Sequence, residues 1–512
     1  MLVKTFGSAV YGIQATTINV EVNISTGTKY YIVGLPDNTV KESWQRIESA
    51  IMAIGFRMPR QKIVVNLAPA DIRKEGSAYD LSIAIGILAA SGQILNEEIA
   101  DYIILGELSL DGSIQPIKGA LPIAIQAKAD GFKGIILPSV NAREAAIVSE
   151  LNILGVERLS QVVGFFEGKE QLPSTIVNIY DEFVNKINNY EVDFADVKGQ
   201  ENIKRALEIA ASGGHNVILI GPPGAGKTML AKRLPTILPP LSVEESLETT
   251  KIHSVAGKFS PSEALMTTRP FRYPHHTISD VALVGGGANP QPGEISLAHN
   301  GVLFLDELPE FKRTVLEVMR QPLESRNISI SRAKFTVEYP ASFMLIAAMN
   351  PCPCGYFNHP ERECICGSTV VQRYLSKISG PLLDRIDLHV EVTPVEFKEL
   401  SNGRSTEDSS AIRQRVMGAR KIQEKRFENN TRVHNNAQMN SKSVREICFL
   451  DDMGKKLLET AMERLNLSAR AYDRILKVAR TIADMEGSEK IQTAHIAEAI
   501  QFRSLDRENW MG

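Results

Sequence analysis

The sequence predicts an α/β protein with a doubly wound parallel sheet at its centre. Three short runs, residues 217–220, 302–305 and 343–349, are continuously apolar, as expected for strands that are buried on both faces of a parallel sheet. Helical segments separate the three runs, which is the alternation that a doubly wound sheet requires. A block of mixed pattern precedes the sheet domain and a helical block follows it, so we expect three domains.

Polar stretches mark the expected domain boundaries. Residues 1–170 alternate strand-like and helical runs and should form an α/β or α+β domain with its own core. A linker at 171–192 leads into the sheet domain, 193–397, and a second polar linker covers 398–410. Residues 411–512 show helical periodicity and few strand signals, which predicts an all-helical domain.

The overall composition is that of an ordinary globular protein, with 43% hydrophobic and 23% charged residues. A net charge of -3 excludes a globally basic nucleic-acid coat, although it allows a local basic patch. No apolar run approaches the roughly 20 residues of a membrane span. Residues 1–14 also lack the long apolar core of a secretory signal. We therefore expect a cytoplasmic protein without a membrane partner.

A phosphate-binding loop is the strongest chemical signal in the chain. Residues 221–228 read GPPGAGKT and match the pattern G-x-x-x-x-G-K-[ST] at every fixed position, between a predicted strand and a predicted helix. Glycines let the backbone wrap around phosphate, and the helix N-terminus adds a favourable dipole. The alternative is a ligand-free turn rich in Gly and Pro. The residues expected to bind ATP are Gly221, Pro222, Pro223, Gly224, Ala225, Gly226, Lys227 and Thr228.

Two carboxylates follow the apolar run 302–305. Asp306, at the end of this predicted strand, is expected to bind ATP and to hold Mg²⁺ together with Thr228. Glu307 would act as the general base on the attacking water, and Lys227 would contact the β- and γ-phosphates. A surface turn with two solvated acids is the alternative. The phosphate loop upstream favours the catalytic interpretation.

Three more polar residues are catalytic candidates. Asn350 ends the predicted strand 343–349, where an amide can position the water beside the γ-phosphate. Arg385 precedes another short strand and is a candidate arginine finger for the nucleotide of a neighbouring subunit. Arg470 opens a predicted helix and could reach the γ-phosphate from the helical domain. Each arginine taken alone could be a surface charge. Since a finger supplied in trans requires an oligomer, we expect a ring.

Four of the five cysteines form two close pairs, Cys352 with Cys354 and Cys364 with Cys366. Two such pairs around a short loop can supply a tetrahedral zinc site without an open position for water, which predicts a structural Zn²⁺. The C-x-C spacing is tighter than the usual spacing, and His359 between the pairs could replace one thiolate. Free thiols or a redox switch are the alternatives. Such clustering is typical of a metal site in a reducing compartment.

Several motifs together resemble a known family. They are RPFRYPHHTIS at residues 269–279, the glycines at 285–287, DELPEF at 306–311 and MNPCPCG at 349–355. The chain resembles the magnesium-chelatase-like AAA+ proteins and, within them, the YifB/ComM family, over essentially its whole length. The resemblance implies an ATP-dependent hexameric DNA helicase that promotes branch migration when incoming DNA recombines. Its partner would be branched or single-stranded DNA.

The resemblance also implies two structural features of the sheet domain. An insertion in the second helix would lie within about residues 267–293, and a hairpin before the Asn350 strand within about 327–338. Arg332 and Lys334 at the tip of this hairpin are candidates for DNA contact in the pore of the ring. An ordinary solvated hairpin turn is the alternative for these two residues.

The first domain resembles the proteolytic domain of Lon proteases. The stretch KEGSAYDL looks like the segment that carries the nucleophilic serine, but Ala78 occupies the matching position. The stretch PIKGAL places Leu121 where the partner lysine would be, while Ser77 and Lys118 lie close by, off the matching positions. A Ser–Lys dyad needs its base within hydrogen-bond reach of the hydroxyl. We therefore expect a retained fold without peptidase chemistry.

Two other functions remain open from the sequence. A chelatase-type AAA+ motor would use the same ATPase to remodel a protein partner, and an assembly scaffold would use nucleotide only to set its oligomeric state. Intact Lys227, Asp306, Glu307 and Asn350 argue against the scaffold. The histidines at 275 and 276 belong to the family motif and have no chemical role that the sequence defines.

Overall fold

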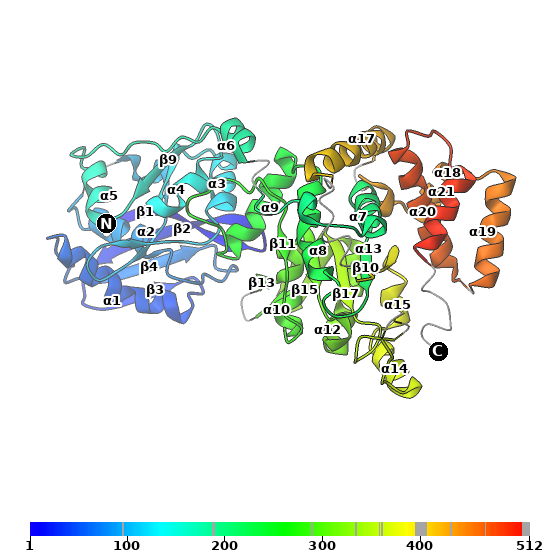
Figure 1. Cartoon of the computed structure of the whole chain (residues 1–512). Helices are drawn as coiled ribbons and strands as arrows, with labels where there is room; N and C mark the ends of the chain where they lie inside the picture. Colours follow the sequence, from blue (N-terminus) through cyan, green and yellow to red (C-terminus); the bar gives the residue numbers. More distant parts are fainter. Residues whose placement is uncertain are drawn as a thin grey trace. The chain divides into compact units, whose positions relative to one another are not determined.

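In a computed structural model of the chain, the described residues form two compact units, shown in Figure 1. The first unit contains Met1–Lys186 and Ser242–Thr267, and the second contains Ile187–Leu241 and Thr268–Gly512. The described residues are 1–94, 97–186, 190–287, 290–332, 335–357, 359, 362–394, 407–430, 433–465 and 467–503. None of the helices formed by these residues is both long and apolar enough to cross a membrane.

A mixed seven-stranded sheet forms the centre of the first unit. Its strands in spatial order are β3 (Tyr30–Val33), β4 (Lys62–Ala68), β2 (Gln14–Ser25), β1 (Leu2–Tyr11), β5 (Tyr102–Ile104), β8 (Gly134–Pro138) and β9 (Asn152–Val156). β1 and β2 form a long antiparallel hairpin, and β4 runs antiparallel to β2. The strands from β1 through β5 and β8 to β9 are parallel. The sheet therefore joins an antiparallel centre, β4–β2–β1, to parallel pairs on both sides, because β3 also runs parallel to β4.

Helices cover both faces of this sheet. The helices are α1 (Asn38–Ala53), α2 (Asp80–Ala90) and α5 (Leu159–Phe166) over one core, and α3 (Ala120–Ala129) and α4 (Ser139–Ala145) over the other. Successive strand residues alternate between the two cores: Ile104 and Ile136 lie in the first, and Ile103 and Ile135 in the second. Each fully buried side chain of this size contributes about 1.5–3 kcal/mol. The alternation therefore fixes the register of the strands.

The polar stretch 171–192, which the sequence analysis interpreted as a linker, contains helix α6 (Ile179–Lys186). Ile179 and Phe183 of this helix pack against a small apolar core that includes Leu121 and Ile147. The helix forms because these apolar residues recur at helical spacing and have a core to contact. The remaining short elements of the first unit are η1 (Glu97–Asp101), β6 (Glu107–Leu108) and β7 (Ile114–Gln115).

A segment expected in the sheet domain, Ser242–Thr267, packs in the first unit instead. It contains α9 (Val243–Val255), and its residues Ala264 and Leu265 complete the small apolar core around Leu121. The main-chain N–H of Gly119 donates to the carbonyl oxygen of Ser254 at 3.2 Å. The segment lies in this unit because its apolar residues cover the N-terminal end of α3. Nothing in their spacing along the chain indicated which core they would join.

A parallel five-stranded sheet forms the centre of the second unit. Its spatial order is β11 (Phe271–Arg272), β14 (Val302–Leu305), β17 (Met344–Met349), β10 (Val217–Ile220) and β18 (Leu388–Glu391). The three apolar runs of the sequence are β10, β14 and β17, which are the inner strands, and their residues are all buried. The predicted parallel sheet is thereby confirmed.

Helices and short strands surround this sheet. They are η2 (Phe194–Asp196), α7 (Glu201–Gly213), α8 (Lys227–Ile237), α10 (Asp280–Val284), β12 (Gly285–Gly286), β13 (Gln291–Pro292), α11 (Glu294–Leu297), η3 (Leu308–Glu310), α12 (Arg313–Val318), α13 (Arg320–Ser325), α14 (Ser368–Leu375) and α15 (Gly380–Leu383). The predicted hairpin before the Asn350 strand is present as β15 (Asn327–Arg332) and β16 (Phe335–Pro340), paired antiparallel.

The C-terminal residues form a helical region, as expected. Its elements are α17 (Ser409–Phe427), η4 (Asn436–Gln438), α18 (Ser441–Ile447), α19 (Asp452–Arg464), α20 (Ala469–Met485) and α21 (Thr493–Gln501). Helix N-termini leave main-chain N–H groups without partners, and polar side chains cap them: Asp408, Asn440, Asp451 and Ser468. Ile475 and Ile482 of α20 share one core with Val217 of β10. Most of the second expected linker, 398–406, lies outside the described residues.

Candidate active site

The phosphate loop connects β10 to α8 and makes a tight turn. Gly224 and Gly226 have φ angles of +80° and +85°, a backbone region that glycine adopts without strain. The Lys227 ammonium points back into the turn, donating to the carbonyl oxygens of Gly221 at 2.7 Å and Pro222 at 2.9 Å. Burial lowers the pKa of Lys227, although nearby carboxylates oppose the shift. A bound phosphate could replace these carbonyl acceptors.

Asn350 joins the phosphate loop to the middle of the sheet. It follows the last residue of β17, and its Oδ1 accepts a hydrogen bond from Lys227 Nζ at 3.1 Å. Burial raises the pKa of Tyr374 in α14 above its usual value, and the nearby main chain of Asn350 opposes this shift. Asn350 therefore lies in hydrogen-bond contact with Lys227 of the phosphate loop.

Asp306 lies directly after β14, where it meets the start of α8. Its Oδ2 accepts a hydrogen bond from Thr228 Oγ1 at 2.6 Å and a second from the Tyr273 hydroxyl at 3.2 Å. Burial raises the pKa of Tyr273, and the charge of Asp306 adds to the shift. A carboxylate beside a threonine hydroxyl supplies the oxygen ligands that Mg²⁺ prefers. The residues present thus fit a magnesium ion at the mouth of the phosphate loop.

Glu307 adopts an unusual backbone conformation for a side-chain-bearing residue. Its φ angle is +52°, a sparsely populated region that persists where the surroundings impose it, often at functional sites. The Glu307 side chain is 57% exposed, and its Oε2 lies 3.2 Å from Nδ1 of His276. The Glu307 carboxylate is therefore accessible to water, and the His276 imidazole contacts one of its oxygens.

Sequence analysis missed Tyr273 and His276 as site residues. Both follow β11, the edge strand beside β14, and each contacts one of the two carboxylates. The available signal was the run RPFRYPHH, which was recognised as a motif without a chemical role. Its role depends on the strand order, which places the end of β11 next to the end of β14.

The two candidate arginines contact residues in and next to helices α13 and α15 of the second unit. Arg385 is 7% exposed and donates to the carboxylate of Glu324 and the carbonyl of Pro381. Arg470, in the first turn of α20, is 61% exposed and lies 3.7 Å from Asp384. The structure thus brings the phosphate loop, Asp306 and Asn350 together by hydrogen bonds, whereas both arginines engage other partners within the chain.

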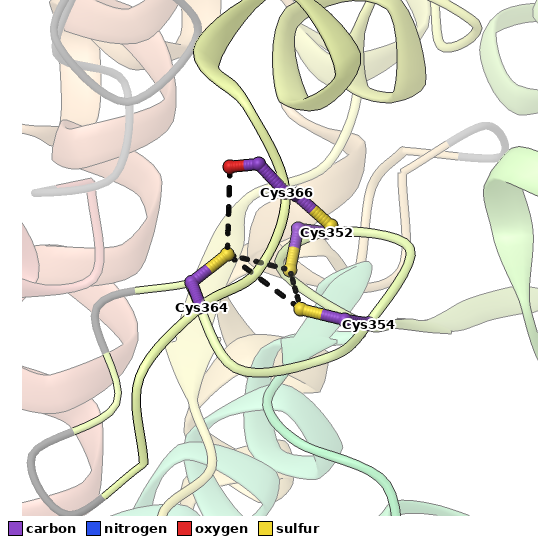
Figure 2. Close-up of side chains that lie close together, drawn as sticks. All are labelled: Cys352, Cys354, Cys364 and Cys366. Carbon is purple, nitrogen blue, oxygen red and sulfur yellow. Dashed lines mark hydrogen bonds between the residues drawn. The ribbon is translucent and has the colours of Figure 1, made fainter.

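The four cysteine thiols of residues 352–366 converge on one point, as Figure 2 shows. The Sγ atoms of Cys352, Cys354 and Cys364 are 3.3, 3.6 and 3.7 Å apart, and all four thiols lie within 4.8 Å of one another. A tetrahedral ion with Zn–S bonds of about 2.3 Å places its sulfur ligands about 3.8 Å apart. The spacing fits one zinc ion. Within the described part of the chain, this group consists of cysteines alone and does not include His359.

The candidate DNA contacts are only partly described. Arg332 ends β15, opposite Phe335 of β16. The side chain of Arg332 and the whole of Lys334 lie outside the described residues. The segment expected to hold an insertion, residues 267–293, contains β11, α10 and β12, so its first strand belongs to the central sheet.

At the Lon-like positions of the first unit, the described contacts do not pair a serine with a lysine. The Ser77 hydroxyl donates to the carboxylate of Glu107, which is an acceptor with no free amine. The stem of Lys118 lies against Gly257. Leu121, at the position of the partner lysine, is fully buried in the apolar core with Ala264 and Leu265. These contacts favour a retained fold without the peptidase dyad.

A phosphate loop after the first core strand, a carboxylate pair after β14, an asparagine after the strand between them and a helical C-terminal region define an AAA+ domain. Comparison with known families agrees with this class. Residues 193–400 match the family described as magnesium chelatase, subunit ChlI. Residues 20–141 match subunit ChlI of Mg-chelatase, and residues 406–503 match the magnesium chelatase subunit ChlI C-terminal family.

Relatives cover nearly the whole chain. Competence protein ComM of Haemophilus influenzae is 44% identical over 99% of this chain and 98% of its own length. YifB of Escherichia coli is 45% identical over 98% of this chain and 96% of its own length. Lon protease 2 of Bacillus subtilis is 29% identical over 31% of this chain and 33% of its own length. The chain belongs to the ComM/YifB family of magnesium-chelatase-like AAA+ proteins.

Proposed function

We propose that this protein is an ATP-driven, ring-forming motor on DNA, a helicase that promotes branch migration when incoming DNA recombines. The observation that carries the ATPase part is the hydrogen bond of 2.6 Å between Thr228 and Asp306. It joins the end of the phosphate loop to the end of β14, where a magnesium nucleotide needs oxygen ligands. The relative called Competence protein ComM supports the DNA part of the proposal.

In this proposal the phosphate loop binds the nucleotide through its main-chain N–H groups. Lys227 leaves its carbonyl acceptors and Asn350 to contact the β- and γ-phosphates. Thr228 and Asp306 hold the Mg²⁺ ion, which neutralises charge on the phosphates when bound. Glu307 accepts the proton of the attacking water, and Asn350 orients that water. Preorganised groups of this kind contribute about 10²–10³-fold each to turnover.

The oligomer in this proposal is a homo-hexameric ring. Arg385 would act as a finger on the nucleotide of the next subunit, and Arg470 would reach the γ-phosphate from the helical region. Because Arg385 pairs with Glu324 in its own chain, ring assembly has to exchange this ion pair for the neighbour's nucleotide. Branched or single-stranded DNA would contact Arg332 and Lys334 at the hairpin tip.

We also propose that the four cysteines bind a structural Zn²⁺. Four protein ligands fill a tetrahedral site, so the ion would have no open position for chemistry. The spacing of the four thiols supports this assignment. Four closely spaced free cysteines support a place in a reducing compartment such as the cytoplasm.

A second candidate is a chelatase-type motor that remodels a protein partner. The match of residues 193–400 to the magnesium chelatase ChlI family favours it. The two candidates share the ATPase site and differ in what the ring acts on. The DNA-dependence of ATP turnover therefore discriminates between them.

The test compares ATP turnover with and without a synthetic branched DNA, alongside displacement of one labelled strand from it. The proposal predicts that branched DNA stimulates turnover more than a linear duplex of equal length does, and that strands separate only with ATP. Lys227→Ala should abolish both. An ATPase that ignores DNA and displaces no strand would overturn the DNA motor and favour the protein-remodelling candidate.

A further inference from the structure

The segment with the four cysteines, residues 352–366, begins two residues after Asn350 of the nucleotide site. Cys352 is the second residue after Asn350, and it is fully buried. The residue before Asn350, Met349, accepts a main-chain hydrogen bond from Gly221 at 3.2 Å. Cys352 therefore lies three residues after Met349, whose carbonyl oxygen is hydrogen-bonded to the phosphate loop.

The turn formed by residues 352–355 contacts the phosphate loop at Pro223. The N–H of Gly355 donates to the carbonyl oxygen of Cys352 at 3.0 Å, which closes a tight turn around Cys354. Gly355 has a φ angle of +85°, and a Cβ atom built on it would lie within 3.0 Å of Cδ of Pro223. Only glycine allows the backbone to approach Pro223 this closely. The turn therefore packs against Pro223 and limits the movement of the phosphate loop on that side.

The second cysteine pair leads into helix α14. Cys364 and Cys366 come just before α14, which begins at Ser368. Tyr374 of this helix is buried, and the main chain of Asn350 lies near its hydroxyl. A single ion bound by all four cysteines would cross-link the turn at Pro223 to the segment that leads into α14. Closing this loop removes conformational freedom from Asn350 and from the turn.

We propose that the four-cysteine centre is a metal-dependent brace of the nucleotide site. Zn²⁺ at these thiols fixes the turn 352–355 against Pro223 and keeps the phosphate loop in its binding conformation. This inference rests on the proposed function only in taking nucleotide as the ligand of the phosphate loop. If metal loss leaves that conformation populated about a tenth of the time, the apparent Kd for nucleotide rises about tenfold.

The first experiment measures metal content and loop dynamics on the full chain. We expect about one zinc per purified chain, removed by a zinc-selective chelator in the presence of excess Mg²⁺. Hydrogen–deuterium exchange should then become faster in peptides that cover residues 221–228 and 349–355, while peptides from β1 and β2 exchange as before. This readout requires neither nucleotide nor DNA.

The second experiment compares nucleotide binding in matched variants, with a fluorescent ADP analogue as the probe. The double variant Cys352→Ser/Cys354→Ser should lose zinc and raise Kd about tenfold. Gly355→Ala should keep zinc and still weaken binding, because its Cβ displaces Pro223. Gly367→Ala, in the same loop, and Gly487→Ala, at φ +66°, both place a Cβ in open space and should leave binding unchanged.

Each outcome decides the proposal. A wild-type chain without metal overturns it, as does a chelated chain whose phosphate loop exchanges at the original rate. If the double variant does not fold, the chelated wild type and Gly355→Ala provide the test. If the wild type binds no ADP analogue, the proposed function fails, while the exchange data still show whether the metal braces the loop.

Discussion

The phosphate loop in the second unit and the Lon-like segment in the first unit both resemble catalytic motifs, but their surroundings differ. Around the phosphate loop, Lys227 and Thr228 bond to polar side chains from the ends of two other strands. In the first unit, Ser77 bonds to Glu107, and Leu121 packs among aliphatic residues where a base would be needed. The phosphate loop has polar partners from two other strands, whereas the position of the Lon lysine is filled by Leu121 in an apolar core.

This difference teaches how far a motif alone indicates chemistry. Both segments keep the local glycine pattern that shapes the backbone. Catalysis depends in addition on groups that arrive from other elements, as Asn350 and Asp306 do at the phosphate loop. The structural role of the first unit is visible in Leu121, which now stabilises the contact between α3 and the segment Ser242–Thr267.

The largest expected effect is the loss of ATP turnover in Lys227→Ala. Removing the ammonium deletes the cation that contacts the β- and γ-phosphates, so turnover should fall by at least about 10²–10³-fold. Ser77→Ala, in the Lon-like segment, is the matched control and should hydrolyse ATP at the wild-type rate. Equal losses in the two variants, measured by phosphate release, would remove the distinction between the two regions.

The next effect is on the stability of the first unit. Leu121→Ala removes a fully buried side chain from a closed apolar core and should lower the free energy of unfolding by about 3–5 kcal/mol. The matched control is Leu110→Ala, because that side chain is 62% exposed. Trp44 in α1 reports unfolding of this unit by fluorescence, in a Trp510→Phe background. A Leu121→Ala chain as stable as the control would refute the packing role.

The stability of the two units should depend on pH in different ways, because each unit contains a buried aspartate with a shifted pKa. Burial raises the pKa of Asp80 in the first unit to about 6, although Arg46 opposes the shift. In the second unit, although burial opposes it, Arg474 and His215 hold the pKa of Asp387 well below its usual range. The folded first unit therefore binds a proton more tightly than the unfolded chain does. Its contribution to stability is fully present below pH 4 and is lost as the pH rises through about 6.

The size of this effect is at most about 3 kcal/mol, from a shift of about two pKa units. Chemical unfolding followed at Trp44 should show the first unit more stable at pH 5 than at pH 7.5. Asp80→Asn cannot titrate and should reduce this difference. A wild-type chain that instead loses stability in the first unit on acidification, with the same profile in Asp80→Asn, would contradict the assignment.

The smallest effect concerns His276, which lies 3.2 Å from the carboxylate of Glu307. His276→Ala should lower kcat about tenfold, because the carboxylate of Glu307 loses the group that orients it. The KM for ATP should stay unchanged, because the contacts to the nucleotide remain. His276→Asn keeps a hydrogen-bond donor and should recover part of the loss. His275→Ala is the control, since that ring bonds to Thr277 instead. A change confined to KM would exclude a positioning role for His276.

Much of the second unit could be predicted from the sequence because its signals are local. The phosphate loop occupies eight consecutive residues, and Asp306 and Asn350 end apolar runs whose parallel arrangement brings their ends together. The clustering of the cysteines was also predictable from their spacing. The long hairpin of β1 and β2 was not predicted, since polar residues interrupt its alternation.

Contacts between distant elements could not be predicted from local patterns. The roles of Tyr273 and His276 depend on β11 lying next to β14 in the sheet. The contact between Gly355 and Pro223 depends on how the loop after β17 folds back. The packing of Ser242–Thr267 in the first unit depends on which core its apolar residues can reach.

The most direct test of the account measures ATP binding and ATP turnover in Glu307→Gln. Glutamine keeps the size of the side chain and cannot accept the proton of the attacking water, so turnover should fall by about 10²–10⁴-fold while Kd for ATP stays the same. Glu310→Gln, three residues further on and paired with Lys377, is the control and should retain turnover. Undiminished hydrolysis in Glu307→Gln would contradict the assignment of the general base and of the site built around it.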